Sequence, residues 1–171
     1  KCGFIADGRV LELLAADPTG HRDTAELITR AVQVKADAVG EDLYDTGRRE
    51  FLNYGHTLAH AIERVEDFGW RHGEAVAVGL VFAAELAVQA GRLSRADADR
   101  HRELVAAMGL PTSYRGNWDR LQSVLRVDKK ARGAALRFVV LDGLGRPGIL
   151  TDPDQAWLDA AWAAVSEVGN A

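Results

Sequence analysis

The chain has 171 residues, 47% of them hydrophobic, and a formal net charge of −4. This length and composition predict one folded domain with a real hydrophobic core. The acidic charge argues against a general nucleic-acid or anionic-membrane surface, and no apolar run approaches the roughly 20 residues that a membrane span needs.

The first residues indicate a piece of a longer protein. The chain begins at Lys1 rather than Met, opens on an apolar run and carries no signal peptide. Its single cysteine, Cys2, has no partner for an internal disulfide. We therefore expect a reducing compartment and a cytoplasmic location.

Two helices are predicted before residue 41. Asp7 is placed to cap a short helix that ends near Ala16, and a longer helix is predicted over 23–40. Lys35 falls among the apolar positions of the second helix, so it either reaches solvent from the core edge or points into a polar pocket. Those apolar positions are Ile28, Ala31, Val32, Ala38 and Val39.

The middle of the chain is predicted to contain two further helices. Residues 41–48 indicate a polar loop, followed by a helix over 49–65 with Gly55 in its interior. A glycine inside a helix costs up to about 1 kcal/mol, and it usually allows a backbone or ligand to approach closely. The next helix, over 72–90, is apolar nearly all round and is therefore predicted to be a central buried helix.

The second half adds helices and one hairpin. Ser94 is placed to cap a helix that ends near Met108, and another helix is predicted over 118–127. Strands are predicted over 136–141 and 147–150, followed by a last helix with Pro153 at its first position. The predicted fold is mainly α, with one small β-hairpin near the C-terminus.

One predicted helix carries an unusual polar face. Arg49, Asn53, His56 and His60 recur at spacings of three and four residues, which places them on one side of a helix over 49–65. A surface helix more often shows Lys, Glu and Gln there. His56 and His60 have the spacing of two ligands to one metal ion, although such a pair is more often incidental.

A third histidine, His72, begins the next predicted helix. The helix N-terminus disfavours imidazolium, and a metal ligand must be neutral imidazole. A capping or surface role for His72 remains open at this point. His21 and His101 are assigned to a polar loop and a polar helix face and are set aside.

Basic residues form the second signal. Lys35, Arg49 and Lys129 are each expected at the surface when considered singly. Together they indicate a substrate with carboxylate or phosphate groups, which Arg binds as a fork and Lys as a point charge.

The segment 143–148 matches the dinucleotide fingerprint G-x-G-x-x-G. That fingerprint requires a helix directly after the turn, with its N-terminus on the pyrophosphate. Pro147 and an apolar pair follow here instead. We interpret the segment as a hairpin loop and not as a cofactor site.

Four segments resemble the 3-dehydroquinate synthase family: 52–63, with its asparagine and histidines, 71–79, 128–130 and the opening 1–7. The resemblance implies the multi-helix C-terminal domain of that fold over 1–171, without the family's N-terminal NAD-binding domain. It implies a sugar-phosphate cyclisation that yields 3-dehydroquinate and phosphate, with NAD+ and Zn2+ or Co2+ as cofactors. A homodimer is also implied, and the chain by itself is expected to be inactive.

The resemblance assigns roles residue by residue. It makes His56 and His72 metal ligands. The third family ligand is a Glu that would precede Lys1. Substrate contacts and active-site lysines are assigned to Lys1, Lys35, Arg49, Asn53, His60 and Lys129. The chain departs from the family at Asp45, where a Glu is usual, and at Ala59, where a Gly is common.

Three alternatives remain open from the sequence. The first is another sugar-phosphate cyclase, of the aminodehydroquinate or 2-deoxy-scyllo-inosose type. The second is a metal-dependent polyol dehydrogenase, which would not need the basic cluster. The third is a helical interaction module whose histidines are structural.

Overall fold

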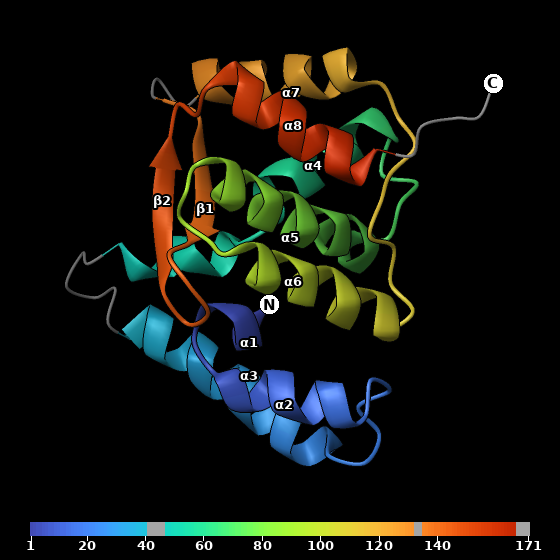
Figure 1. The fold of residues 1–171 in the computed structure, drawn as a ribbon, viewed down its shortest axis with the longest axis vertical. Helices are drawn as coiled ribbons and strands as arrows, with labels where there is room; N and C mark the ends of the chain where they lie inside the picture. Colours follow the sequence, from blue (N-terminus) through green and yellow to red (C-terminus); the bar gives the residue numbers. More distant parts are fainter. Residues whose placement is uncertain (41–46, 132–134, 167–171) are drawn as a thin grey trace.

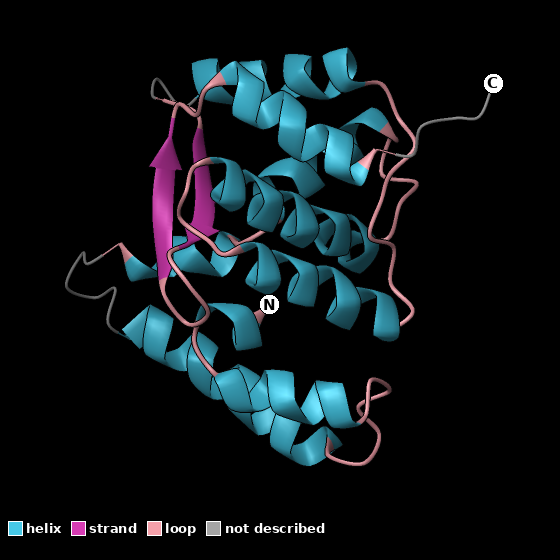
Figure 2. Cartoon of the chain, viewed as in Figure 1, coloured by secondary structure: helices cyan, strands magenta, loops and turns pink. Residues whose placement is uncertain are grey.

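The structure, a computed structural model, describes residues 1–40, 47–131 and 135–166, and at 128–131 it describes the backbone without the side chains. The described chain is mainly helical with one two-stranded antiparallel sheet, as predicted (Figure 2). Helix α5 (His72–Gln89) runs through the middle (Figure 1). Helices α4 (His56–Val65), α6 (Arg95–Ala107) and α8 (Gln155–Val165) pack against it, together with strand β1 (Arg137–Leu141).

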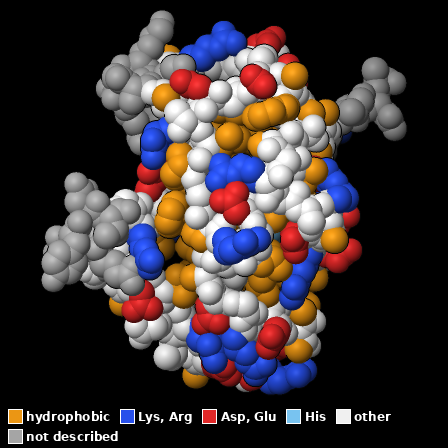
Figure 3. All heavy atoms as spheres, turned by 60° about the vertical axis from the view of Figure 1, so that its left-hand side comes forward, with side chains coloured by type: hydrophobic (Ala, Val, Ile, Leu, Met, Phe, Trp, Pro, Cys, Tyr) orange, Lys and Arg blue, Asp and Glu red, His pale blue; other side chains and the backbone are white. Residues whose placement is uncertain are grey.

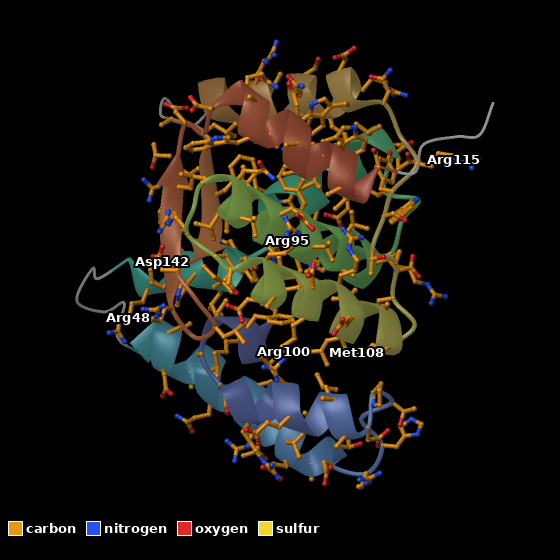
Figure 4. All side chains as sticks on the ribbon, in the orientation of Figure 1. Arg48, Arg95, Arg100, Met108, Arg115 and Asp142 are labelled. Carbon is orange, nitrogen blue, oxygen red and sulfur yellow. The ribbon has the colours of Figure 1, made fainter. Side chains whose placement is uncertain are left out.

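Helix α5 is the core helix that its all-round apolar sequence predicts. Twelve of its residues are buried, from Ala75 to Ala87. Among the helices described, it alone has the length and composition of a membrane span, and 67% of it is buried inside the protein, as in a core helix. The buried Glu85 on α5 is paired by Arg95 of α6 at 2.8 Å and Arg102 at 3.6 Å. Figure 4 labels Arg95 at this helix pair.

The predicted continuous helix over 49–65 is wrong. The structure has a 3₁₀ helix at Arg48–Asn53, then a break, and then α4 from His56. Gly55 lies in the break with φ 80°. A Cβ on Gly79 of α5 would lie 2.0 Å from the Gly55 carbonyl oxygen, so the two backbones are in direct contact. The interior glycine therefore permits close approach, as expected, but it does so by ending one helix and starting another.

Three N-terminal helices form a peripheral layer: α1 (Cys2–Ile5), α2 (Gly8–Ala16) and α3 (Thr24–Gly40). Asp7 caps α2 by accepting the Arg9 N–H, as predicted. In contrast, the apolar pattern of α3 does not mark a buried face. The helix has no buried residue, and Ile28 and Val32 are 59% and 62% exposed. Its main neighbours among the described elements are α1, α2 and the 3₁₀ helix, and they leave Ile28 and Val32 uncovered.

The second half follows the prediction with shifted boundaries. Ser94 caps α6 by accepting the Asp97 N–H. Helix α7 (Trp118–Ala131) is longer than predicted. Helix α8 begins at Gln155, so Pro153 precedes it instead of opening it. The side chain of Asp152 accepts the Leu136 N–H and so ties the strand ends together.

The hairpin joins β1 to β2 (Pro147–Thr151) with Val139 opposite Ile149. Its turn contains Gly143 and Gly145, both with positive φ. A strand follows the glycines, so the fingerprint-like segment is a hairpin loop, as predicted.

The assignment of His101 to a polar helix face is wrong. Its ring is fully buried and stacks on Phe4 with centroids 3.7 Å apart. Nδ1 donates to the Asp97 carbonyl at 2.7 Å, and Nε2 accepts from the Tyr54 hydroxyl at 3.0 Å. Burial lowers the pKa of His101 to about 4. The low-hydropathy sequence of α6 conceals this inward residue because its partners come from distant segments.

Charges on the described part of the surface are mixed. On the face drawn in Figure 3, Lys and Arg side chains lie among Asp and Glu rather than in a continuous basic area.

Candidate active site

The structure brings three histidines together where α4 meets the start of α5. The ring centroids of His56 and His60 are 5.6 Å apart, those of His56 and His72 are 5.3 Å apart, and those of His60 and His72 are 6.3 Å apart. His56 and His60 come from the first turns of α4, and His72 is the first residue of α5. The packing of these two helices, anchored at Gly55 and Gly79, therefore builds the cluster.

The ring of His56 is held from one side. Its Nδ1 lies 3.1 Å from the Tyr54 carbonyl oxygen. A carbonyl can only accept, so Nδ1 carries the hydrogen and Nε2 keeps its lone pair. Burial lowers the pKa of His56, and nearby positive charge from Lys1 and the other histidines lowers it further. These effects favour the neutral imidazole that a metal ligand requires.

His72 is held in the same way by a different acceptor. Its Nδ1 lies 2.9 Å from Oε1 of Glu63, so its Nε2 is also left with a lone pair. Sequence reasoning missed Glu63. The signal was present in the spacing, because Glu63 follows His56 by seven residues and so lies on the same face of α4.

The donor set fits a metal ion. Two imidazoles that bind one tetrahedral zinc through nitrogen hold their ring centroids about 5 Å apart, close to the 5.3 Å between His56 and His72. Distance does not exclude His60, whose centroid lies 5.6 Å from that of His56. Within the described residues, no group of three or more His, Cys, Asp or Glu side chains is arranged to hold a metal.

Basic groups lie beside the histidines. Lys1 donates to the Leu52 carbonyl at 2.7 Å. Partial burial lowers the pKa of Lys1, and the charge of Lys35 lowers it further. The charge of Lys35 therefore acts on Lys1, and the charge of Lys1 acts on His56. Arg49 is exposed on the 3₁₀ helix. The prediction that Arg49 and His56 share one continuous helix is therefore wrong.

A pocket of about 390 Å³ adjoins the cluster. Its lining comes from α4, α7, the 3₁₀ helix and β1, and it includes Asn53, His56, His60 and Glu63. The pocket is therefore lined by three of the predicted site residues. Lys129 lies on α7, but its side chain is outside the described part of the chain, and Asp45 is likewise outside it.

Sequence reasoning also missed the wall opposite α4. Arg137 of β1 lines the pocket and binds Glu50 through two bonds, of 2.9 Å from Nε and 2.8 Å from Nη2. The Arg137 carbonyl accepts from the Thr57 hydroxyl at 3.2 Å. This fork ties the 3₁₀ helix, which carries Arg49 and Asn53, to the hairpin. A pair 87 residues apart gives no local sequence signal.

The fold is that of the sugar-phosphate cyclases. A solved 2-epi-5-epi-valiolone synthase from Streptomyces hygroscopicus, with NAD+ and Zn2+ bound, matches with a TM-score of 0.83 and 20% identity over 95% of this chain and 47% of that chain. A 2-deoxy-scyllo-inosose synthase complexed with carbaglucose-6-phosphate, NAD+ and Co2+ matches with a TM-score of 0.69 and 26% identity, over 82% of this chain and 42% of that one.

Sequence comparison places the chain within this class. The model of the family described as "3-dehydroquinate synthase C-terminal" matches residues 1–131, and the chain belongs to that family. It is 58% identical to the 3-dehydroquinate synthase of Arthrobacter sp. (strain FB24) over 97% of this chain, and 55% identical to that of Streptomyces avermitilis over 98%. It spans 47% and 48% of the length of those two relatives.

Proposed function

We propose that this chain is the C-terminal half of a 3-dehydroquinate synthase, which converts 3-deoxy-D-arabino-heptulosonate 7-phosphate into 3-dehydroquinate and phosphate in the shikimate pathway. The observation that carries the proposal is the His56–His72 pair, two imidazoles with Nδ1 occupied and Nε2 available, in a chain 58% identical to a synthase of that name. The family's chemistry needs such a pair for its metal.

In this proposal His56 and His72 hold Zn2+ or Co2+. A Glu on the segment before Lys1 completes the site, and an N-terminal domain holds NAD+. When bound, the metal polarises the hydroxyl and carbonyl groups that are interconverted, while NAD+ takes up and returns a hydride. The chain's own part is to present neutral imidazoles, which the burial of His56 supports.

The polar residues around the pair bind the anionic substrate. Arg49 and Lys35 are suited to a carboxylate. Asn53 and His60 line the pocket next to His56, where His60 contacts the phosphate. Lys1 and Lys129 complete the set of active-site lysines. Holding both anionic ends fixes the reacting carbons relative to the metal, which lowers the entropic part of the barrier.

The setting of the enzyme is part of the same proposal. We infer a cytoplasmic homodimer in which each chain contains both halves, and we infer that residues 1–171 without the N-terminal half have no activity. The lone Cys2, half-buried and unpaired, agrees with a reducing compartment.

A second cyclase activity is the main alternative, because solved relatives of this fold include 2-deoxy-scyllo-inosose synthase. Identity favours the dehydroquinate activity, at 58% against 26%. A polyol dehydrogenase is less favoured, since it has no use for the basic cluster of Lys35, Arg49 and Lys129.

The test is phosphate release by the longer protein that contains this chain. With the heptulosonate phosphate, NAD+ and Zn2+, we expect phosphate and 3-dehydroquinate in equal amounts, and no phosphate after chelation of the metal. No release with both cofactors present would refute the proposal. Release from glucose 6-phosphate instead would move the protein to the inosose branch.

A further inference from the structure

We propose that Glu63 is a positioning residue that holds the ring of His72 in the orientation and tautomer needed for metal binding. This inference rests on the proposed function, since it assumes that His72 is a ligand. Glu63 itself is given no direct contact with metal or substrate. The inference adds to the proposed site the side chain that orients its second histidine.

The two residues differ sharply in their freedom. The side chain of His72 is 57% exposed, at the very first position of α5, whereas that of Glu63 is 12% exposed on the third turn of α4. An exposed imidazole at a helix end can adopt several rotamers, and ordering it costs conformational entropy. The contact of 2.9 Å between Nδ1 and Oε1 holds the exposed ring against the largely buried carboxylate.

The same contact sets the tautomer. A carboxylate oxygen accepts, so the hydrogen is on Nδ1 and the lone pair is on Nε2. A ligand histidine commonly donates its other nitrogen to a carboxylate or a carbonyl, which orients the ring and raises its basicity. His56 has the carbonyl version of this arrangement through Tyr54, and His72 has the carboxylate version through Glu63.

A direct ligand role for Glu63 is the competing explanation. Glu63, His56 and His72 are all described, and no three-member group of His, Cys, Asp or Glu among the described residues is arranged to hold a metal. Oε1 of Glu63 is occupied by the imidazole. The geometry therefore makes Glu63 a hydrogen-bond acceptor for the His72 ring and not a metal ligand.

The experiment measures metal affinity in the longer protein, purified as apoprotein and titrated with Co2+ against a competing chelator. Absorption of the bound Co2+ in the visible range reports its ligand geometry independently of turnover. We expect Glu63→Ala to weaken Co2+ binding by about 10- to 100-fold and to alter the spectrum. Glu63→Gln is isosteric, its amide oxygen can still accept from Nδ1, and we expect a smaller loss.

Glu66→Gln is the matched control. Glu66 is the other partly buried carboxylate at the end of α4, but its partner is the Tyr114 hydroxyl. We expect it to lower stability without changing Co2+ affinity. Unchanged affinity and spectrum in both Glu63 variants, with wild-type binding intact, would overturn the positioning role. Absence of Co2+ binding by the wild-type protein would instead refute the proposed function, and the positioning role with it.

Discussion

The buried histidine His101 and the site histidines His56 and His72 differ in how their ring nitrogens are bonded. His101 is buried between α1 and α6, and both of its ring nitrogens are bonded within the protein, one to Asp97 and one to Tyr54. His56 lines a pocket and His72 lies beside it, with ring centroids 5.3 Å apart; each has Nδ1 bonded to an oxygen of the protein while Nε2 is available. Whether a ring nitrogen is left without a protein partner separates a structural histidine from a candidate ligand better than exposure does. A metal ligand needs a nitrogen lone pair that no protein group already uses.

Tyr54 connects His101 to the site. Its buried hydroxyl donates to His101, and its carbonyl accepts from His56. The core therefore holds the backbone that orients the first histidine of the site. Changes at His101 or at the site should be distinguishable by whether they affect stability or chemistry.

The largest effect is expected from removing one histidine of the site. His56→Ala in the longer protein should lower the rate of phosphate release by about a thousandfold, because it removes a metal ligand and several kcal/mol of charge stabilisation. His21→Ala, on an exposed loop residue, is the control and should keep full activity. Activity within tenfold of wild type in His56→Ala would contradict the assignment.

The contact that joins the two helices should be the most sensitive point of the core. In Gly79→Ala the new Cβ would meet the Gly55 carbonyl oxygen at 2.0 Å, so α4 must shift, and we expect a loss of at least about 3 kcal/mol. Gly73→Ala is the control on the same helix, because its Cβ would meet nothing within 4 Å. It should stay within about 1 kcal/mol of wild type. Urea unfolding measures both, and equal midpoints would show that the contact is not tight.

His101 should make stability depend on pH. Burial lowers its pKa to about 4, whereas in the unfolded chain it is near 6.5. Between these values the unfolded chain binds a proton that the folded protein excludes, so the free energy of unfolding falls as the pH is lowered from 6.5 to 4, by up to about 3 kcal/mol. Above pH 6.5 this contribution is fully present.

His101→Asn removes the titrating group, so the difference in unfolding free energy between wild type and variant should shrink over that window. The measurement is urea unfolding at pH 7 and at pH 4.5. A difference that does not change with pH would show that the proton is not excluded.

The smallest effect is expected at the Arg137–Glu50 fork, whose side chains are 46% and 35% exposed. Glu50→Gln should change stability by less than about 1 kcal/mol. It should still raise the KM for the sugar phosphate a few-fold, because the fork steadies the 3₁₀ helix that carries Arg49 and Asn53.

Asp142→Asn is the control for the fork. It breaks a similar two-bond pair with Arg92 at the hairpin turn, where Figure 4 labels Asp142; Asp142 does not line the pocket. Its KM should not change. Equal KM values in both variants would remove the fork from the account of substrate binding.

Local patterns predicted most of the elements, because the capping residues Asp7 and Ser94 and the apolar run of α5 act over a few residues. The errors arose where distant segments decide the outcome. The break at Gly55 exists because α5 approaches it, and His101 is buried because Phe4 and Tyr54 come to it. The spacing of apolar and polar residues along one helix contains no information about either contact.

The site divides in the same way. Helical spacing placed His56 and His60 on one face, whereas the role of His72 came from the family resemblance; the structure brings the three rings together. Glu63 and the Arg137–Glu50 fork were missed, the first because an acidic helix residue is ordinary, the second because its partners are far apart in sequence. The choice of His72 over His60 as ligand came from family resemblance and stays a prediction.

Metal content tests that choice most directly. Zinc per chain should be measured in the longer protein for the wild type, His72→Ala and His60→Ala, after equilibration with a slight excess of Zn2+ and removal of free metal. The account predicts one ion per chain in the wild type and in His60→Ala, and none in His72→Ala. Zinc retained by His72→Ala and lost from His60→Ala would contradict it.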